Sequence, residues 1–255
     1  MPYTFIMEST SEQGNFKYVG RQLLESNELL LRSYNTSIIE LVLSNSPTLK
    51  SDSEVLDFGA GVGTLSSILL EKTNTKPVTL EIDETQREIL VSRGFKVIGD
   101  LRKQEKRFDL IFTSNVLEHI EDDLAVLKEL SLCLKDFSSR LIIYVPAFPL
   151  LFSDLDRSVD HYRRYSKKDL VEKIKKSGME VQKCHYADSI GFFATIIIKL
   201  IGWKNSVDFT SDKSMRVYDR YIFPLSKTLD KILLKRLLGK NLFAVASLPL
   251  PLGKS

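Results

Sequence analysis

Three glycines at alternate positions follow a short apolar segment and a single acidic residue. The run from 54 to 63 reads Glu-Val-Leu-Asp-Phe-Gly-Ala-Gly-Val-Gly, with the acid at Asp57 and the glycines at Gly59, Gly61 and Gly63. Glycines at this spacing let the backbone turn sharply and approach a ligand closely, because no Cβ stands in the way. The helix predicted directly after them adds unpaired N–H groups and a partial positive charge. This run therefore predicts a loop that binds a small molecule.

The spacing of these glycines separates two classes of ligand. Loops that bind dinucleotides read Gly-x-Gly-x-x-Gly, with a pyrophosphate over the helix N-terminus. Here the second gap holds one residue, and Asp57 stands two positions before Gly59. A carboxylate at that place would repel a pyrophosphate but suits a ligand that carries an amine or a sulfonium. The loop therefore argues against a nicotinamide dehydrogenase.

Three more apolar segments read as strands, and each leads into polar residues. Residues 76–80 lead into Glu81, residues 95–98 into Asp100, and residues 108–112 into the run Thr-Ser-Asn-Val-Leu-Glu-His. Open α/β sheets bind ligands at the carboxyl ends of their strands, and an acidic residue after the second strand bonds the ribose hydroxyls of a nucleoside. Together with the glycine loop, these segments predict one nucleoside-binding edge.

These four segments, in this order, resemble those of the class I S-adenosylmethionine (SAM)-dependent methyltransferases, over about residues 53–146. The resemblance implies SAM as cofactor and S-adenosylhomocysteine as product. It also implies that Asp100 lies against the adenine amino group and that residues 113–119 close over the methionine part. The expected cofactor-binding residues are Asp57, Gly59, Ala60, Gly61, Gly63, Glu81, Ile82, Asp100, Leu101, Asn115 and Leu117.

Strands and helices alternate along the chain, and this alternation indicates the fold class. The predicted elements are helices at 64–71, 83–92 and 121–134, a fifth strand at 140–145, a helix at 166–177 and a sixth strand at 179–186. Alternation of this kind requires a parallel, doubly wound sheet with right-handed crossovers. The resemblance places the last strand, 242–246, antiparallel between the fifth and the sixth. We therefore expect an α/β Rossmann-like fold with a seven-stranded sheet.

A chain of 255 residues with 43% hydrophobic content is long enough for one large globular domain. We expect a single methyltransferase domain over residues 1–255. Its parts are an N-terminal helical cap (1–50), a SAM-binding core (51–188), an apolar and basic helical insertion (189–240) and a final strand (241–247). Within the cap, apolar residues at helical spacing predict one or two helices between 21 and 43.

The loop after the fifth strand narrows the resemblance. Residues 146–165 combine prolines, aromatic residues, three aspartates and the run His-Tyr-Arg-Arg-Tyr. They resemble a bacterial subgroup, methyltransferase type 11/12-like, that is found with glycosyltransferases of cell-surface glycan or glycolipid assembly. The two guanidinium groups could clamp a phosphate or carboxylate, or form salt bridges to the nearby aspartates. We expect the acceptor to bind at Tyr162, Arg163, Arg164 and Tyr165.

Two histidines are candidates for catalysis. Methyl transfer from a sulfonium is an in-line displacement, and an oxygen nucleophile also profits from a general base. His161 lies in the acceptor-side loop and is the first candidate; its alternative role is a hydrogen bond to Asp160 that fixes the loop. His119 is the second, with cofactor contact or helix capping as alternatives. The three histidines and two cysteines show no metal-ligand spacing, so no metal is expected.

Basic residues gather near the end of the chain. The net charge is +3, but residues 199–240 carry ten lysines or arginines against four aspartates. This region overlaps an apolar run (190–203), too short to span a bilayer, and contains an amphipathic helix (224–238) with a stripe of three lysines. Both segments predict contact with an anionic membrane or a lipid-linked acceptor, or a lid over the site. Nucleic acid is not expected, because the basic residues are confined to one region.

The N-terminus lacks a basic region followed by an apolar run, so we expect a cytoplasmic enzyme. The apolar and basic segments near the end of the chain add the expectation that it is peripheral at the inner face of the membrane. Its expected reaction is methyl transfer to an oxygen of a sugar, a glycolipid precursor or another small molecule. Two alternatives stay open. One is a quinone-like or other small aromatic acceptor, because the Ser-Asn-Val-Leu-Glu-His-Ile run also resembles enzymes of that kind. The other is a non-catalytic SAM-binding partner in a glycan-assembly complex. Nothing in the sequence indicates the oligomeric state.

Overall fold

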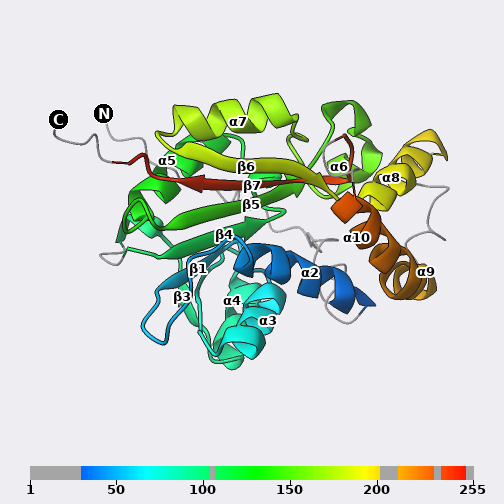
Figure 1. Ribbon diagram of the computed structural model, residues 1–255. Helices are drawn as coiled ribbons and strands as arrows, with labels where there is room; N and C mark the ends of the chain where they lie inside the picture. Colours follow the sequence, from blue (N-terminus) through cyan, green and yellow to red (C-terminus); the bar gives the residue numbers. More distant parts are fainter. Residues whose placement is uncertain (1–29, 104–106, 202–211, 233–236, 251–255) are drawn as a thin grey trace, which may run out of the picture.

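The computed structural model describes residues 30–103, 107–201, 212–232 and 237–250 (Figure 1). Seven strands form one sheet in the order β3-β2-β1-β4-β5-β7-β6. The strands are β1 (Val55–Phe58), β2 (Val78–Leu80), β3 (Lys96–Ile98), β4 (Leu110–Ser114), β5 (Arg140–Pro146), β6 (Glu180–Ala187) and β7 (Asn241–Ser247). β7 pairs antiparallel with both β5 and β6, whereas the other pairs are parallel. The predicted α/β fold with an antiparallel last strand is confirmed.

Helices cover both faces of the sheet (Figure 1). Successive residues of β5 alternate between two apolar cores, with Leu141 and Ile143 in one and Ile142 and Tyr144 in the other. The helices that pack into these cores are α5 (Asp123–Cys133) and α7 (Lys167–Lys176) on the first side, and α2 (Arg32–Leu43) and α3 (Thr64–Thr73) on the second. Strands that are buried on both faces read as nearly continuous apolar runs, which is why the sequence showed them clearly.

Side-chain caps explain where two of the helices begin. Asp83 accepts a hydrogen bond from a first-turn backbone N–H of α4 (Glu84–Ser92), and Ser166 does the same for α7. Both caps satisfy backbone donors that would otherwise lack partners. The two helices therefore begin one residue later than the predicted starts at 83 and 166, which are the capping residues.

The fourth strand begins later than predicted. We expected it over 108–112, but the ladder with β1 begins at Leu110, and Phe108 makes an isolated bridge to Leu134. The polar run that follows β4 consequently begins inside the strand, which ends at Ser114. An apolar run alone does not show where pairing begins, because Phe108 is buried without lying in the strand.

Among the described residues between β6 and β7, three helices lie at the carboxyl edge of the parallel strands (Figure 1). They are α8 (Ser189–Ile201), α9 (Asp212–Val217) and α10 (Phe223–Ile232), and a π turn (Tyr218–Ile222) joins the last two. Asp219 in this turn accepts hydrogen bonds of 2.9 and 2.8 Å from the backbone N–H groups of Ser33 and Tyr34. Asp188 at the end of β6 accepts hydrogen bonds from the hydroxyls of Tyr218 and Ser226. Carboxylates thus fix the insertion to α2 and to the sheet.

Helix α10 turns two side chains into the protein, Phe223 and Ser226, whereas Leu225, on the apolar side of the predicted amphipathic helix, is exposed. Phe223 packs edge-on against the ring of Tyr34 at 5.1 Å, and the Ser226 hydroxyl bonds Asp188. These two contacts fix the buried side of the helix.

One lysine of the predicted stripe is engaged within the molecule, because Lys227 forms an ion pair with Glu40 at 2.6 Å. Other predicted features lie outside the described residues, namely residues 1–29 of the cap, Trp203, the side chain of Lys231, and Lys235. Among the helices that the structure describes, none has the length and apolar content needed to cross a membrane.

Candidate active site

The glycine loop joins β1 to α3 at the carboxyl edge of the sheet. Gly59 has a φ angle of 76°, and a Cβ built on it would lie 2.3 Å from a methyl carbon of Val116. Only glycine therefore fits this position. The N–H groups of Gly59 and Ala60 donate to the carbonyl of Leu80, at 2.9 and 3.0 Å. Gly63 closes the loop as the buried residue before α3. The loop is therefore held against the ends of β1 and β2 by the chain's own contacts.

Glu81 fastens the loop to the second strand. One carboxylate oxygen accepts a hydrogen bond from the Gly61 N–H at 2.8 Å. The other accepts from the N–H groups of Ile82 and Asp83, at 2.7 and 3.0 Å. The adjacent Ile82 side chain is 63% exposed. A carboxylate with one further acceptor position, beside an exposed apolar side chain, suits the ribose and the flat base of a nucleoside.

Asp57 lies beneath the glycine loop, not on its surface. Its side chain is buried and accepts a hydrogen bond from the Ser66 hydroxyl of α3 at 2.7 Å. Burial raises the pKa of the Asp57 carboxyl to about 7, although the bond from Ser66 acts in the opposite direction. Asp57 thus ties β1 to α3 and supports the glycine loop from beneath, while its contact with the cofactor stays a prediction.

The other expected cofactor residues divide into two groups. Asp100 forms an ion pair with Arg102 at 3.0 Å, and Asn115, at a φ angle of 54°, is exposed after β4. These two side chains lie at strand ends, as predicted. Leu101 and Leu117 instead belong to the apolar core, because the 3₁₀ turns that contain them direct these side chains inward. We therefore assign the side chains of both leucines to packing.

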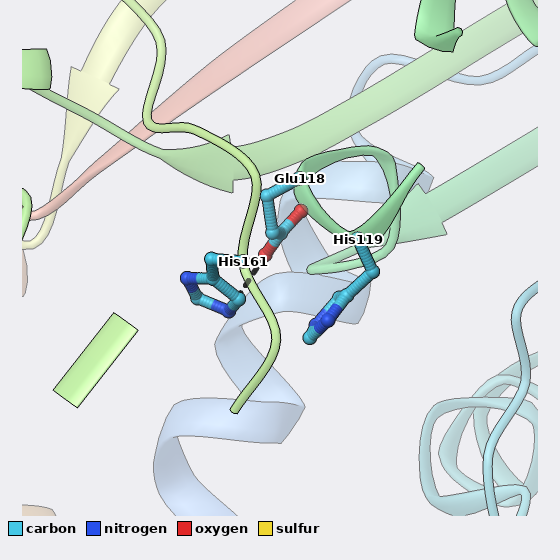
Figure 2. A group of neighbouring side chains, drawn as sticks. All are labelled: Glu118, His119 and His161. Atoms are coloured by element: carbon cyan, nitrogen blue, oxygen red, sulfur yellow. Dashed lines mark ion pairs between the residues drawn. The ribbon is translucent and has the colours of Figure 1, made fainter. Parts of the chain in front are cut away.

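Beyond the end of β4, a 3₁₀ turn (Leu117–His119) places two polar side chains beside a third from the distant loop (Figure 2). The three are Glu118, His119 and His161. The two imidazole rings meet edge to face, with their centres 4.5 Å apart. The N–H of Tyr162 donates to the carbonyl of Glu118 at 2.8 Å and so holds the loop against the turn. Both histidines predicted to act in catalysis are thus brought together.

His161 is oriented by a buried aspartate. Its Nδ1 lies 2.9 Å from Oδ1 of Asp156, which also accepts a 2.7 Å hydrogen bond from Nε of Arg164. Burial opposes ionisation, but the bonds from His161 and Arg164 lower the pKa of the Asp156 carboxyl to about 2. An ionised Asp156 keeps the ring proton on Nδ1, because only a donor can bond a carboxylate. The Nε2 lone pair of His161 therefore faces Glu118, at 4.0 Å from Oε1.

Glu118 is the unusual member of the cluster. Its side chain is 0% exposed, and neither carboxylate oxygen accepts a hydrogen bond from another described residue. Burial raises the pKa of this carboxyl to about 8. Burial, together with His161, lowers the pKa of His119 to about 4, so its ring is neutral at pH 7. The cluster thus combines the neutral imidazole of His119, the ring of His161 and a buried carboxyl that lacks the hydrogen-bond partners such groups normally have.

The predicted acceptor residues have mostly structural contacts. Arg163 forms an ion pair with Asp123 at 3.1 Å, and Arg164 is buried against Asp156. Tyr165 is fully buried and donates to Asp123 at 2.6 Å. The alternative role of the arginines, a salt bridge to a nearby aspartate, is found for Arg164 with Asp156. These contacts fix the loop, and the acceptor role of the two arginines and Tyr165 stays a prediction. Tyr162, which is 56% exposed beside the cluster, is the one expected acceptor residue whose side chain is open to a ligand.

Two important residues were not singled out from the sequence. Asp156 carried a local signal, because Ser153 and Asp156 form a capping box at the start of α6 (Asp154–Ser158). Recognising that capping box would have predicted the start of α6 within the loop. Glu118 carried no such signal, since its importance depends on its burial next to His161, which lies 43 positions further along the chain.

Comparison with known proteins agrees with this geometry. A family model of the methyltransferase domain matches residues 30–183, which is more than half of the chain. No curated protein matches the chain at a significant level.

Three solved structures illustrate the similarity of fold. A putative methyltransferase of Haloferax volcanii, in complex with the Trm112 methyltransferase activator, superposes with a TM-score of 0.60 at 14% identity, covering 91% of this chain and 97% of that one. A SAM-dependent methyltransferase of Archaeoglobus fulgidus superposes with a TM-score of 0.58 at 17% identity, and the match covers 89% of this chain and 98% of that one. Phosphoethanolamine N-methyltransferase 2 of Haemonchus contortus, in complex with SAM, superposes with a TM-score of 0.54 at 16% identity. The match covers 84% of this chain and 53% of that one.

At these identities the solved structures show a common fold. The family match adds the activity, and the glycine loop with Glu81 and Ile82 fits the nucleoside part of SAM. The chain therefore belongs to the methyltransferase domain family and is a class I SAM-dependent methyltransferase.

Proposed function

We propose that this enzyme transfers the methyl group of SAM to an oxygen of a small hydroxylated acceptor, a sugar or a glycolipid precursor. The observation that carries this proposal is the Glu118, His119 and His161 cluster at the end of β4. A hydroxyl must lose its proton as it is methylated, and an imidazole beside the acceptor promotes that loss as a general base. His161 and His119 are the proposed catalytic residues, and exposed Tyr162 contacts the acceptor beside them.

The proposed cofactor site lies at the ends of β1 to β4. Glu81 bonds the ribose hydroxyls, exposed Ile82 covers the adenine, and Asp100 lies near the adenine amino group. The glycine loop between Gly59 and Gly63 and the exposed Asn115 hold the methionine part. SAM, when bound, supplies an activated methyl group, and the residues of the chain align it with the acceptor oxygen.

A screen with isotope-labelled SAM tests the reaction. Nucleotide sugars, lipid-linked sugars and catechol-like aromatic acceptors are incubated with the full chain, and methylated products are analysed for the atom that carries the label. Label on a sugar oxygen supports the proposal. Label on an aromatic oxygen supports the quinone-like alternative, and binding of SAM without transfer to any acceptor supports the non-catalytic alternative.

We also propose that the insertion contacts a membrane surface or the lipid part of the acceptor. On α8, Phe193, Ile197 and Leu200 are 52%, 44% and 80% exposed, at a spacing that places them on one side of the helix. Lys199 donates to the carbonyl of Leu150, whose side chain is also exposed, so the loop extends this apolar surface. Exposed apolar side chains on a basic insertion suit an anionic lipid surface.

Liposome flotation tests this contact. Wild-type protein should float with vesicles that contain anionic lipid at low salt and less so at 1 M salt, because screening weakens the attraction. Replacement of Phe193, Ile197 and Leu200 by Ser should abolish flotation. A protein that stays in solution with every vesicle would contradict the proposed contact without affecting the proposed reaction.

A further inference from the structure

Three potential metal ligands converge in the Glu118, His119 and His161 cluster. One donor atom from each side chain lies within 4.8 Å of the other two (Figure 2). Glu118 supplies the decisive second observation, because its fully buried carboxylate has no hydrogen bond from another described residue. A buried carboxyl is strongly disfavoured as an anion unless a positive charge, such as a bound metal ion, compensates it.

The surroundings of the two histidines match those of metal ligands. Metal-binding histidines usually donate their second ring N–H to a carboxylate or a backbone carbonyl, which fixes the ring and leaves the other nitrogen for the ion. His161 meets this condition through Asp156, at 2.9 Å from Nδ1. The ring of His119 lies beside the backbone of Val159 and Asp160. Asp156 is itself held by Arg164, so the outer partner is also fixed.

We propose that Glu118, His119 and His161 bind one divalent transition-metal ion, such as Zn²⁺ or Mn²⁺. Two imidazole nitrogens and one carboxylate oxygen favour such ions over Mg²⁺ or Ca²⁺, which prefer oxygen ligands throughout. Coordination bonds are about 2.0–2.2 Å long, so the three donor atoms must approach one another by rotation of their side chains. Three protein ligands leave positions open for a further ligand, as in catalytic metal sites.

The spacing of the ligands in the sequence gave no sign of this site. Glu118 and His119 are adjacent, and His161 comes from a loop that only the fold brings beside them. Tyr162 secures this arrangement, because its N–H bonds the carbonyl of Glu118.

The role of the ion rests on the proposed function, whereas its binding does not. With the ion bound, His119 and His161 hold the ion and do not themselves accept the proton. The ion would polarise the acceptor hydroxyl, which releases its proton to solvent. The acceptor oxygen then bonds the methyl carbon while the carbon–sulfur bond breaks, and the electron pair of that bond stays on sulfur. The positive charge of the sulfonium thus leaves as the released proton, and the products are the methyl ether and S-adenosylhomocysteine.

Metal titration of the full chain tests the proposal. Protein freed of metal with EDTA is titrated with Zn²⁺ by calorimetry and with Mn²⁺ by electron paramagnetic resonance, with Mg²⁺ as the comparison ion. We expect one Zn²⁺ per chain. Loss of a group that bonds a metal ligand typically lowers metal affinity by about 10–100-fold, and we expect a decrease in this range for Asp156→Asn. Glu118→Gln removes a ligand itself and should lower Zn²⁺ affinity by more than that.

Two features keep the test decisive. Glu118→Gln preserves side-chain volume at a position without hydrogen bonds to other described side chains, and His161→Asn offers a second ligand deletion if that variant does not fold. The matched control is His185→Gln, because His185 lies on β6 outside the cluster and should leave Zn²⁺ affinity unchanged.

Each outcome bears on one proposal. Absence of tight Zn²⁺ and Mn²⁺ binding, or binding that Glu118→Gln and His161→Asn leave intact, overturns the metal site. If the metal-free enzyme still methylates oxygen at full rate, the proposed function stands and the catalytic role of the ion fails. Stoichiometric Zn²⁺ binding that requires Glu118 supports the site, even if the acceptor screen finds no oxygen methylation.

Discussion

The carboxyl edge of the sheet has two halves, which satisfy their polar groups in opposite ways. The cofactor half holds the glycine loop and Glu81, and the acceptor half holds the Glu118, His119 and His161 cluster. In the cofactor half, Glu81 receives three backbone hydrogen bonds and Asp57 receives one from Ser66. In the acceptor half, Glu118 is fully buried and receives none from another described residue. The cofactor half is therefore organised by its own contacts, whereas the acceptor half keeps a buried polar group that no other described residue satisfies. This difference suits a general cofactor and a specific acceptor.

In the acceptor half, the enzyme should lose activity when His161 is replaced by Asn, which removes Nε2. His161→Asn keeps a donor where Nδ1 meets Asp156 but removes the second ring nitrogen. We expect turnover to fall by about 10²–10⁴-fold, the contribution of a positioned proton-transfer group, with SAM affinity unchanged. Initial rates with labelled SAM and calorimetry of SAM binding measure the two quantities. An equal loss of SAM affinity would place His161 in the cofactor half.

The two adjacent arginines should differ in their effect on stability. Arg164→Ala leaves Asp156 buried without its guanidinium partner, and breaking a buried pair in this way costs about 3–5 kcal/mol. Arg163→Ala should cost about 1 kcal/mol or less, because Asp123 keeps its bonds from Tyr165 and Lys173. Urea unfolding of both variants measures the difference. Equal losses of stability would refute the assignment of Arg164 to the support of His161.

The cofactor half could be predicted from the sequence because its interactions are local. The glycines, the apolar strands and the acid after β2 each act within a few residues, and Gly59 needs its special backbone angle wherever the loop occurs. Side-chain direction was harder to predict. Leu117 is adjacent to Glu118, yet a 3₁₀ turn sends it into the core.

The acceptor half could not be predicted in the same way. Its cluster depends on backbone hydrogen bonds between segments far apart in the chain, such as that from Tyr162 to Glu118. The insertion shows the same limit, because its amphipathic pattern did not show which side of α10 would be buried, and Ser226 is buried against Asp188. Long-range polar contacts leave no periodic pattern in the sequence.

Removing Glu81 should weaken the cofactor half without affecting the cluster. Glu81→Ala deletes the acceptor for the loop N–H groups and for the ribose. We expect SAM binding to weaken by about 1.5–3 kcal/mol, the range for hydrogen bonds to a charged group. Glu84→Ala, at an exposed carboxylate of the same turn, is the matched control. Zn²⁺ affinity should stay constant in both variants, and a parallel loss would show that the two halves are not independent.

The smallest expected effect concerns Asp57, the one carboxyl of the glycine loop region that burial disfavours as an anion. Its pKa is raised from an ordinary value of 3.8 to about 7 in the folded protein. A raised pKa means that the folded state holds the proton more tightly than the unfolded state does. The stability from this group is therefore complete below pH 3.8 and is lost as the pH rises toward 7. One pKa unit corresponds to about 1.4 kcal/mol, so the decline in unfolding free energy between pH 4 and 7 should reach at least that amount.

Asp57→Asn keeps an oxygen that accepts the Ser66 bond but has no proton to lose, so its decline over this range should be smaller by that amount. Asp52→Asn, at an exposed position before β1, should retain the wild-type slope. Urea unfolding at several pH values measures all three proteins. If wild type and Asp57→Asn show equal slopes, Asp57 is accessible to water in solution, and the cofactor half is less tightly organised by its own contacts than the comparison with Glu118 requires.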